Sequence, residues 1–228
     1  EIKKETNLAV TLSVGERDKE TYQYWQKKGM DRFLLRFETA NRKLFKYCHP
    51  DDDFDKRIQS LNDLKELGVQ TGSGFLIGLP KETYEELAED ILFCTDLDLD
   101  MIGVGPFIPH GDTPFGETEN PFDPEVYFKV IAILRLLNKN AHIPSTTAFD
   151  AIQPGARDLL LQRGANVFMP NSTPKKHRKH YMIYPNKPCT EESASDCAVC
   201  VIRRVEKLGR TIGKGHGHSL KVRSTEVV

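Results

Sequence analysis

The composition of the chain places it among ordinary globular proteins. It has 228 residues, of which 39% are hydrophobic and 29% are charged, a balance typical of a soluble protein with one sizeable core. The net charge of −1 provides no basic field for nucleic acid, and no apolar run approaches the roughly 20 residues that span a membrane. The chain opens with Glu1 rather than Met, in a charged stretch that leads straight into a strand, so we expect a fragment whose N-terminal portion lies upstream.

Strand and helix patterns alternate along the chain. Apolar or β-branched runs predict strands at residues 8–14, 32–38, 70–77, 100–105, 143–148 and 166–169. Helical spacing of apolar residues predicts helices at residues 18–28, 55–67, 83–97, 124–137 and 155–163. Thr83 and Glu86 have the spacing of a capping box. Six βα units in one continuous repeat imply a parallel α/β sheet. Six strands are too few for a closed (β/α)8 barrel, so either two units lie upstream or the sheet is open.

Two charges stand where an apolar strand ends. Arg36 and Glu38 are separated by one residue, so their side chains point to the same face of a strand. Two charges on one face are unfavourable inside a sealed core. They indicate either a polar cavity at the mouth of a barrel or open sheet, or a surface ion pair on an edge strand.

The character of the chain changes after residue 171. Residues 172–184 are basic and aromatic, and residues 213–218 have the composition of a mobile tail. Between them lie Cys189, Cys197 and Cys200. The Cys-x2-Cys pair can place two thiolates on one ion, which suits an iron–sulfur cluster or zinc; the alternatives are a surface cluster and a redox pair. We therefore expect a barrel at 1–171 and an extension at 172–228.

The two other cysteines are isolated. Cys94 falls on the apolar side of a predicted helix and is interpreted as a core residue, whereas Cys48 falls in a predicted loop.

Several motifs occur in a fixed order. They are Leu-Leu-Arg-Phe-Glu-Thr-Ala-Asn at 34–41, Gly-Leu-Pro at 78–80, Gly-Val-Gly-Pro-Phe-Ile-Pro-His-Gly-Asp-Thr-Pro at 103–114, Ile-Pro-Ser-Thr-Thr-Ala at 143–148 and Gly-Ala-Asn-Val-Phe-Met-Pro-Asn at 164–171. With these motifs and the cysteine spacing, the chain resembles the radical S-adenosylmethionine (SAM) enzymes of the biotin synthase group, and within it the FeFe-hydrogenase maturases. The resemblance implies a (β/α)8 TIM barrel of radical SAM type, with strands 3 to 8 present here.

One feature of the family is missing. The Cys-x3-Cys-x2-Cys loop that holds the radical-generating 4Fe–4S cluster does not occur in these residues. Because the first strand here resembles the third strand of the family, that loop would lie upstream of Glu1. The chain by itself is then expected to be inactive.

The resemblance also implies roles for individual residues. Glu38 corresponds to the acid that binds the ribose hydroxyls of SAM, and Arg57 to the arginine that binds its carboxylate. Arg57 could instead be a surface residue of an amphipathic helix. Met101 corresponds to a methionine that contacts SAM, with a core methionine as the alternative. The cysteine trio matches an accessory 2Fe–2S or 4Fe–4S cluster.

Further residues correspond to the lining of the internal cavity, namely Arg36, Thr146, Thr147, Tyr181 and Tyr184. For Arg36 and the two threonines, the alternative is polar residues at strand ends that hydrogen-bond to loops.

The implied function is a maturase that assembles the dinuclear iron subcluster of the H-cluster through a 5′-deoxyadenosyl radical. Its substrate would be a small iron-bound precursor derived from cysteine, and its partners other hydrogenase maturation proteins. One alternative is another biotin-synthase-like enzyme, a mutase or a sulfur inserter. The other is a non-catalytic, cluster- or zinc-binding half-barrel. The compartment would be the cytoplasm or an anaerobic organelle matrix, such as a hydrogenosome or chloroplast stroma.

Overall fold

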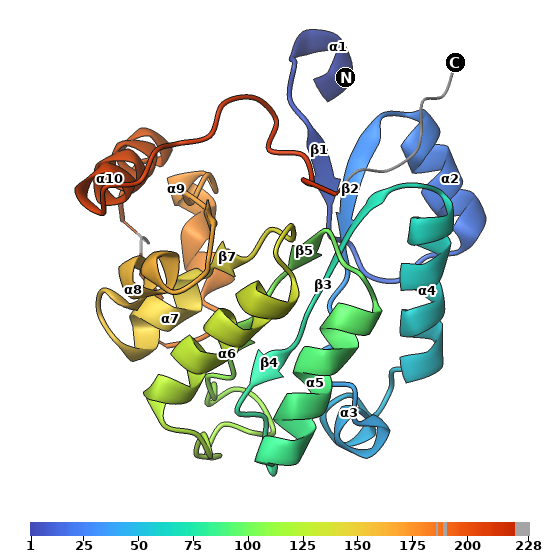
Figure 1. The fold of residues 1–228 in the computed structure, drawn as a ribbon, viewed down its shortest axis with the longest axis vertical. Helices are drawn as coiled ribbons and strands as arrows, with labels where there is room; N and C mark the ends of the chain where they lie inside the picture. The colour runs from blue at the N-terminus through green and yellow to red at the C-terminus, as the bar shows by residue number, and fades with distance from the viewer. Residues whose placement is uncertain (186, 189–190, 222–228) are drawn as a thin grey trace.

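The largest sheet is parallel and has four strands. In the computed structural model, which describes residues 1–185, 187–188 and 191–221, its strand order is β1 (Val10–Leu12), β2 (Met30–Leu34), β3 (Gln70–Ser73) and β5 (Met101–Ile102). The register places Leu34 of β2 beside Gly72 of β3, and Gly72 beside Met101 of β5. β2 is therefore an interior strand of this sheet (Figure 1).

Two further pairs of parallel strands extend the main sheet. They join β4 (Leu76–Ile77) to β6 (Gly105–Pro106), and β7 (Pro144–Ser145) to β8 (Val167–Phe168). Isolated bridges from Glu38 to Phe75 and from Met101 to His142 connect them to the main sheet. β4 continues the path of β3, and β6 that of β5, so six strand positions follow one another. The predicted partial barrel of six βα units is confirmed.

Helices cover the outside of the curved sheet (Figure 1). The main helices between strands are α2 (Lys19–Lys27), α4 (Phe54–Glu66), α5 (Tyr84–Asp96), α6 (Pro124–Leu137) and α8 (Ala156–Gln162). Thr83 and Glu86 form the predicted capping box at the start of α5. The remaining helical segments are α1 (Ile2–Glu5), α3 (Arg42–Cys48), α7 (Thr147–Ile152), α9 (Lys175–Arg178), the 3-10 turn η1 (Lys179–Tyr181) and α10 (Ala194–Lys207).

Two short helices correct the predictions from sequence. α3 occupies a stretch that was predicted to be loop, so Cys48 is the last residue of a helix. The strand predicted at 143–148 ends at Ser145, because α7 begins at Thr147. Both helices fill connections at the carboxyl ends of strands, where the candidate site residues also lie.

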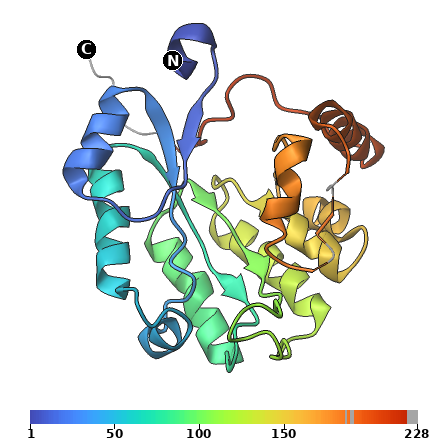
Figure 2. The same ribbon diagram turned by 180° about the vertical axis from the view of Figure 1, so that it is seen from behind.

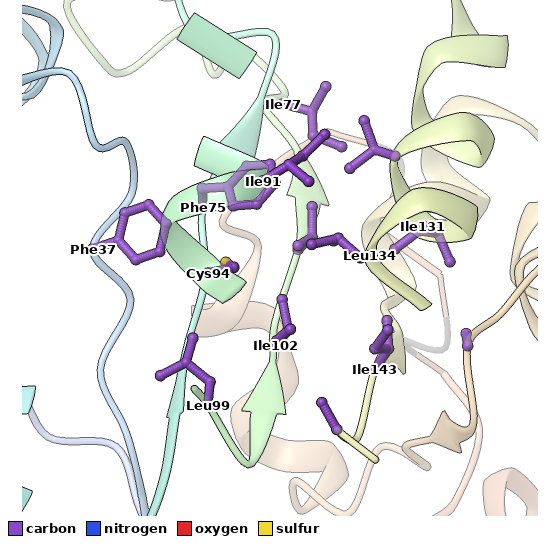
Figure 3. Close-up of a cluster of buried hydrophobic side chains, with 14 of the residues drawn as sticks. Phe37, Phe75, Ile77, Ile91, Cys94, Leu99, Ile102, Ile131, Leu134 and Ile143 are labelled. Atoms are coloured by element: carbon purple, nitrogen blue, oxygen red, sulfur yellow. The ribbon is translucent and has the colours of Figure 1, made fainter. Parts of the chain in front are cut away.

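The core lies between the strands and helices α5 and α6. Figure 3 shows Phe75 and Ile102 from the strand side facing Ile91 and Cys94 of α5 and Leu134 of α6, and all five are at most 7% exposed. Burial of each large aliphatic or aromatic side chain is worth about 1.5–3 kcal/mol. Cys94 is fully buried and belongs to this core, as predicted.

The C-terminal segment packs back onto the barrel. Arg204 of α10 forms ion pairs with Asp150 and Asp158. The stretch that follows α10 crosses to the beginning of β1 and β2 in both views (Figures 1 and 2). There, Arg32 donates to the carbonyl oxygen of His216, and the residues predicted to form a mobile tail thus contact the barrel. The boundary at 171/172 stays a prediction.

In the part of the chain described, no helix is both long and apolar enough to cross a bilayer.

Candidate functional site

Glu38, in the segment that follows β2, is held in an unusual backbone conformation. Its φ is +70°, a left-handed value that costs a non-glycine residue about 1–3 kcal/mol. Two hydrogen bonds maintain it, from Glu38 N to Gly74 O at 3.1 Å and from Leu76 N to Glu38 O at 3.1 Å. The backbone at the β3–β4 junction therefore fixes the direction of the Glu38 carboxylate.

Arg36 and Glu38 form a partly buried ion pair. Arg36 Nη2 lies 3.0 Å from Glu38 Oε2, with side chains 29% and 18% exposed, and also donates to Phe75 O at 3.0 Å. This contact is not aligned as a hydrogen bond, so Glu38 Oε2 is buried without a hydrogen-bond partner among the described residues. Arg36 Nε is also buried without one. The Arg36 cation at 3.0 Å stabilises this carboxylate electrostatically, and Oε2 still has lone pairs that can accept a hydrogen bond from a polar ligand. Because β2 is interior, the edge-strand alternative is wrong.

Arg57 comes to the same region from α4. Its Nε lies 2.5 Å from Glu16 Oε1 and its Nη2 lies 2.8 Å from Asp52 Oδ2. Its Nη1 donates to the carbonyl oxygen of Arg36 at 3.4 Å. The side chain is 8% exposed, so the surface alternative for Arg57 is wrong. A ligand carboxylate would have to replace Glu16 or Asp52, and this role for Arg57 stays a prediction.

Replacing Arg57 with alanine is expected to lower the free energy of unfolding by about 1–3 kcal/mol. The change removes the cation that pairs with Glu16 and Asp52. These carboxylates are 34% and 44% exposed, and Asp52 still lies 3.4 Å from His49 Nδ1, so part of the loss is offset. Urea denaturation measures the difference. The control is Arg42→Ala, which removes an exposed ion pair with Asp55 and should cost less than about 1 kcal/mol. Equal losses in the two variants would contradict the structural role of Arg57.

Two of the predicted cavity residues meet at the carboxyl end of β7. Thr147 Oγ1 lies 2.9 Å from the hydroxyl oxygen of Tyr184, and Tyr184 is 9% exposed. Thr146 Oγ1 is 3.5 Å from Val104 O. These residues follow β7 as Glu38 follows β2, so in a parallel barrel they share its catalytic end. Tyr181, by contrast, is 55% exposed.

Met101 lies at the other end of the barrel strands. It is the first residue of β5 and pairs with Gly72, which pairs with Leu34. Glu38 comes four residues after Leu34, about 13 Å at the usual strand rise. The structure therefore does not bring Met101 next to Glu38. The assignment of Met101 to SAM stays a prediction that this geometry does not favour.

The structure describes two of the three clustered cysteines. Cys197 is 4% exposed, and its sulfur accepts a hydrogen bond from Asn171 N at 3.1 Å, whereas Cys200 is exposed. Cys189 lies outside the described residues. Among the residues described, no three His, Cys, Asp or Glu side chains stand together to hold a metal ion. The accessory cluster stays a prediction.

The sequence interpretation missed a pair of buried acids behind Glu38. Glu82 is 4% exposed and Asp90 is fully buried. Burial raises the pKa of Glu82 to about 7 and that of Asp90 to about 8. The sequence did contain a signal for the burial of Asp90, because Asp90 shares the apolar stripe of α5 with Leu87, Ile91 and Cys94.

Cys48, at the end of α3, lies close to the candidate site. Partial burial, together with the charges of Glu82 and Glu38, raises the pKa of its thiol to about 11. Cys48 is therefore a neutral thiol near these acids at physiological pH.

Comparison with known proteins shows which family the chain belongs to. Residues 1–94 match the Radical SAM superfamily. The chain is 45% identical over 225 residues to the [FeFe] hydrogenase maturase subunit HydE of Thermotoga maritima. The aligned region makes up 99% of this chain and 64% of that protein. The chain belongs to the radical SAM superfamily. A biotin synthase of Syntrophotalea carbinolica is 30% identical over 169 residues, which is 74% of this chain and 51% of that protein.

Solved structures agree with a radical SAM barrel. A methylornithine synthase matches with a TM-score of 0.76 at 23% identity, over 93% of this chain and 61% of that one. HydG, a maturase of the [FeFe]-hydrogenase, matches with a TM-score of 0.63 at 20% identity, over 71% of this chain and 37% of that one. At these identities the likeness shows the fold, and the chain spans less than two thirds of these relatives.

The superfamily implies two cofactors, SAM and a 4Fe–4S cluster, and the residues present fit only the first. Glu38 Oε2 is ion-paired with Arg36 but accepts no hydrogen bond from the described residues, and a carboxylate oxygen suits the hydroxyl donors of a ribose. A cluster needs closely spaced thiolates. The Cys-x3-Cys-x2-Cys spacing is missing from this sequence, and the described cysteines do not form a metal site. The Cys-x3-Cys-x2-Cys ligands of the radical-generating cluster are therefore missing from this sequence, and a SAM site at Glu38 stays a prediction.

Proposed function

We propose that this chain is the SAM- and substrate-binding part of a radical SAM maturase of FeFe-hydrogenase. The identity of 45% to HydE over nearly the whole chain supports the reaction class. The observation that carries the cofactor assignment is the unsatisfied Glu38 Oε2, fixed by backbone hydrogen bonds after β2. When bound, SAM would supply a 5′-deoxyadenosyl radical through a 4Fe–4S cluster held by residues outside this chain.

The residues around Glu38 suit the binding of SAM. The Glu38 carboxylate would accept hydrogen bonds from the ribose hydroxyls. The Arg57 guanidinium, already positioned for two carboxylates, would bind the carboxylate of SAM in exchange for one of them. Arg36 keeps the negative charge of Glu38 in place at 3.0 Å. These roles require no group outside the described residues apart from SAM itself.

The substrate would be a small, polar, iron-bound precursor derived from cysteine, which the enzyme converts toward the dinuclear iron subcluster. Arg36 offers a cation at the carboxyl end of the strands, and the hydroxyl pair of Thr147 and Tyr184 offers hydrogen-bond donors. These groups suit an anionic ligand at the same end of the barrel as SAM. The product would pass to other hydrogenase maturation proteins.

A complementation experiment tests the proposed function. The whole protein is expressed in an anaerobic strain that makes FeFe-hydrogenase but lacks its HydE-type maturase, and hydrogenase activity is measured. Wild-type protein should restore activity, and Glu38→Ala should not. Glu89→Gln, an exposed change on α5, should restore activity like the wild type.

The failure of complementation by soluble, SAM-cleaving protein would contradict the maturase assignment. It would favour the second candidate, a biotin-synthase-like mutase or sulfur inserter, which the 30% identity to biotin synthase supports. If the whole protein bound clusters but neither cleaved SAM nor restored activity, a non-catalytic cluster-binding role would replace both enzymatic candidates.

A further inference from the structure

Two buried carboxyl groups connect the loops on either side of the candidate site. Glu82 Oε2 accepts hydrogen bonds from Gly78 N at 2.6 Å and from Leu79 N at 3.1 Å, in the turn after β4. Asp90 Oδ1 accepts from Ala40 N and, at 3.2 Å, from Thr39 Oγ1. Thr39 and Ala40 directly follow Glu38. Each acid thus holds a different loop, and one of these loops carries Glu38.

The two acids face each other. Their remaining oxygens, Glu82 Oε1 and Asp90 Oδ2, are buried and receive no hydrogen bond from any donor group among the described residues. The carboxyl groups are nevertheless close enough to hydrogen-bond to each other. Two carboxylates cannot form such a bond, because neither has a hydrogen to donate. One proton between the two groups satisfies both oxygens.

The surroundings favour retention of that proton. The titratable groups that face the pair are Glu86 and Cys94 on α5, Cys48 on α3 and Tyr127 on α6. None of these groups is a cation that would stabilise a second negative charge. Burial raises the pKa of both acids, to about 7 for Glu82 and about 8 for Asp90. Near neutral pH the pair therefore carries a proton.

We propose that Glu82 and Asp90 share one proton, and that the resulting O–H···O hydrogen bond positions Glu38 for its ligand. The bond ties the Thr39–Ala40 segment to the Gly78–Leu79 turn, and so limits the movement of the Glu38 carboxylate. Both acids are positioning residues, since they act through the loop and do not touch the ligand. The inference rests on the proposed role of Glu38 in binding SAM.

The sign of the pH dependence follows from proton linkage. Carboxyl groups in the unfolded chain have pKa values near 4, below the raised values of this pair in the folded protein. The folded state therefore binds more protons between about pH 4 and pH 8, and its stability falls as pH rises through this range. Loss of the shared proton leaves two adjacent buried charges that repel each other. The affinity for SAM should then fall between about pH 6.5 and pH 8.5.

Amide variants test the shared proton. The Gln of Glu82→Gln can accept from Gly78 and Leu79 through its carbonyl oxygen and donate from its amide to Asp90 at every pH. The Asn of Asp90→Asn can bind Thr39 and Ala40 and donate to Glu82 in the same way. Each single variant should keep SAM affinity within about threefold of the wild type at pH 6.5 and lose the dependence on pH.

The double variant Glu82→Gln/Asp90→Asn places two amide donors against each other. It should bind SAM about tenfold or more weakly than either single variant, because neither N–H group has an acceptor. If the acids held their loops independently, the two effects would simply add. The control is Glu89→Gln, an exposed neighbour on the same helix, which should keep the wild-type pH profile.

Two readouts separate this inference from the proposed function. Calorimetry of SAM with the whole protein measures affinity, and urea denaturation of the same protein measures the unfolding midpoint, each from pH 6 to 9. If SAM does not bind to the wild type, the proposed function fails, while the unfolding midpoints still test the pair. The inference is supported by a flatter midpoint profile in each single variant and a more than additive loss in the double variant. The inference would be overturned if the unfolding midpoint of Glu82→Gln depended on pH as strongly as that of the wild type. Additive losses in the double variant would also overturn it.

Discussion

The largest loss of stability is expected from Gly74→Ala, which should destabilise the protein by more than about 3 kcal/mol and prevent stable folding in a protein of ordinary stability. Gly74 has a φ of +151°. A Cβ at this position would lie 2.1 Å from the carbonyl oxygen of Gly103 and 2.7 Å from its carbonyl carbon. This collision is with backbone that pairs β3 to β5, since Gly103 N donates to Ser73 O at 2.7 Å, so a small side-chain movement cannot relieve it.

Gly68→Ala is the matched control for this prediction. Gly68 also has a positive φ, +72°, but a Cβ there would meet no atom within 4 Å. The substitution should cost only about 1–2 kcal/mol, the conformational cost of a left-handed residue. Urea denaturation and soluble yield of the two variants measure the difference. Comparable stability of the two variants would show that the close approach at Gly74 is not a constraint on the barrel.

The largest effect on binding is expected from Glu38→Ala, which should weaken SAM binding by about ten- to a hundredfold. The variant loses charge-assisted hydrogen bonds, each worth about 1.5–3 kcal/mol. It also leaves Arg36 without its carboxylate partner at 3.0 Å. The measurement is calorimetric titration of SAM into the whole protein. Glu38→Gln, which keeps the shape but not the charge, should fall between the wild type and Glu38→Ala.

A control separates a local effect from unfolding. Glu38 has a positive φ of +70°, and both variants keep a non-glycine residue there, so the backbone preference changes little. Circular dichroism and the unfolding midpoint should stay close to those of Glu89→Gln. If both Glu38 variants bound SAM as tightly as the wild type, residues 34–41 would not form the cofactor site.

Regular periodicity explains why most of the barrel could be predicted. α5 begins with a capping box, and α6 has proline in its first turn, both of which are local signals in the sequence. α3 was missed because it is seven residues long and has only Leu44 and Phe45 buried. Its cap, Asn41, which accepts hydrogen bonds from Lys43 N and Leu44 N, was a signal that could have identified it.

The candidate site was harder to predict because it depends on register and on contacts between distant segments. The sequence indicates that Arg36 and Glu38 share one side of a strand, and the structure pairs them. It does not show how far Met101, near the beginning of the strand predicted at 100–105, lies from Glu38 across the sheet. Nor does it show that Glu16 and Asp52 already pair with Arg57. Strand ends and ion-pair partners are settled only when the segments pack together.

The most direct test of the central assignment is the formation of 5′-deoxyadenosine by the whole protein. Anaerobically reconstituted protein would be incubated with SAM and a strong reductant, and the product measured by chromatography. Wild-type protein and Glu89→Gln should form 5′-deoxyadenosine at similar rates, and Glu38→Ala should form it at least about tenfold more slowly at subsaturating SAM. Equal rates for Glu38→Ala and wild type, or no product from wild-type protein with a full complement of iron, would contradict the assignment of this barrel end as a radical SAM site.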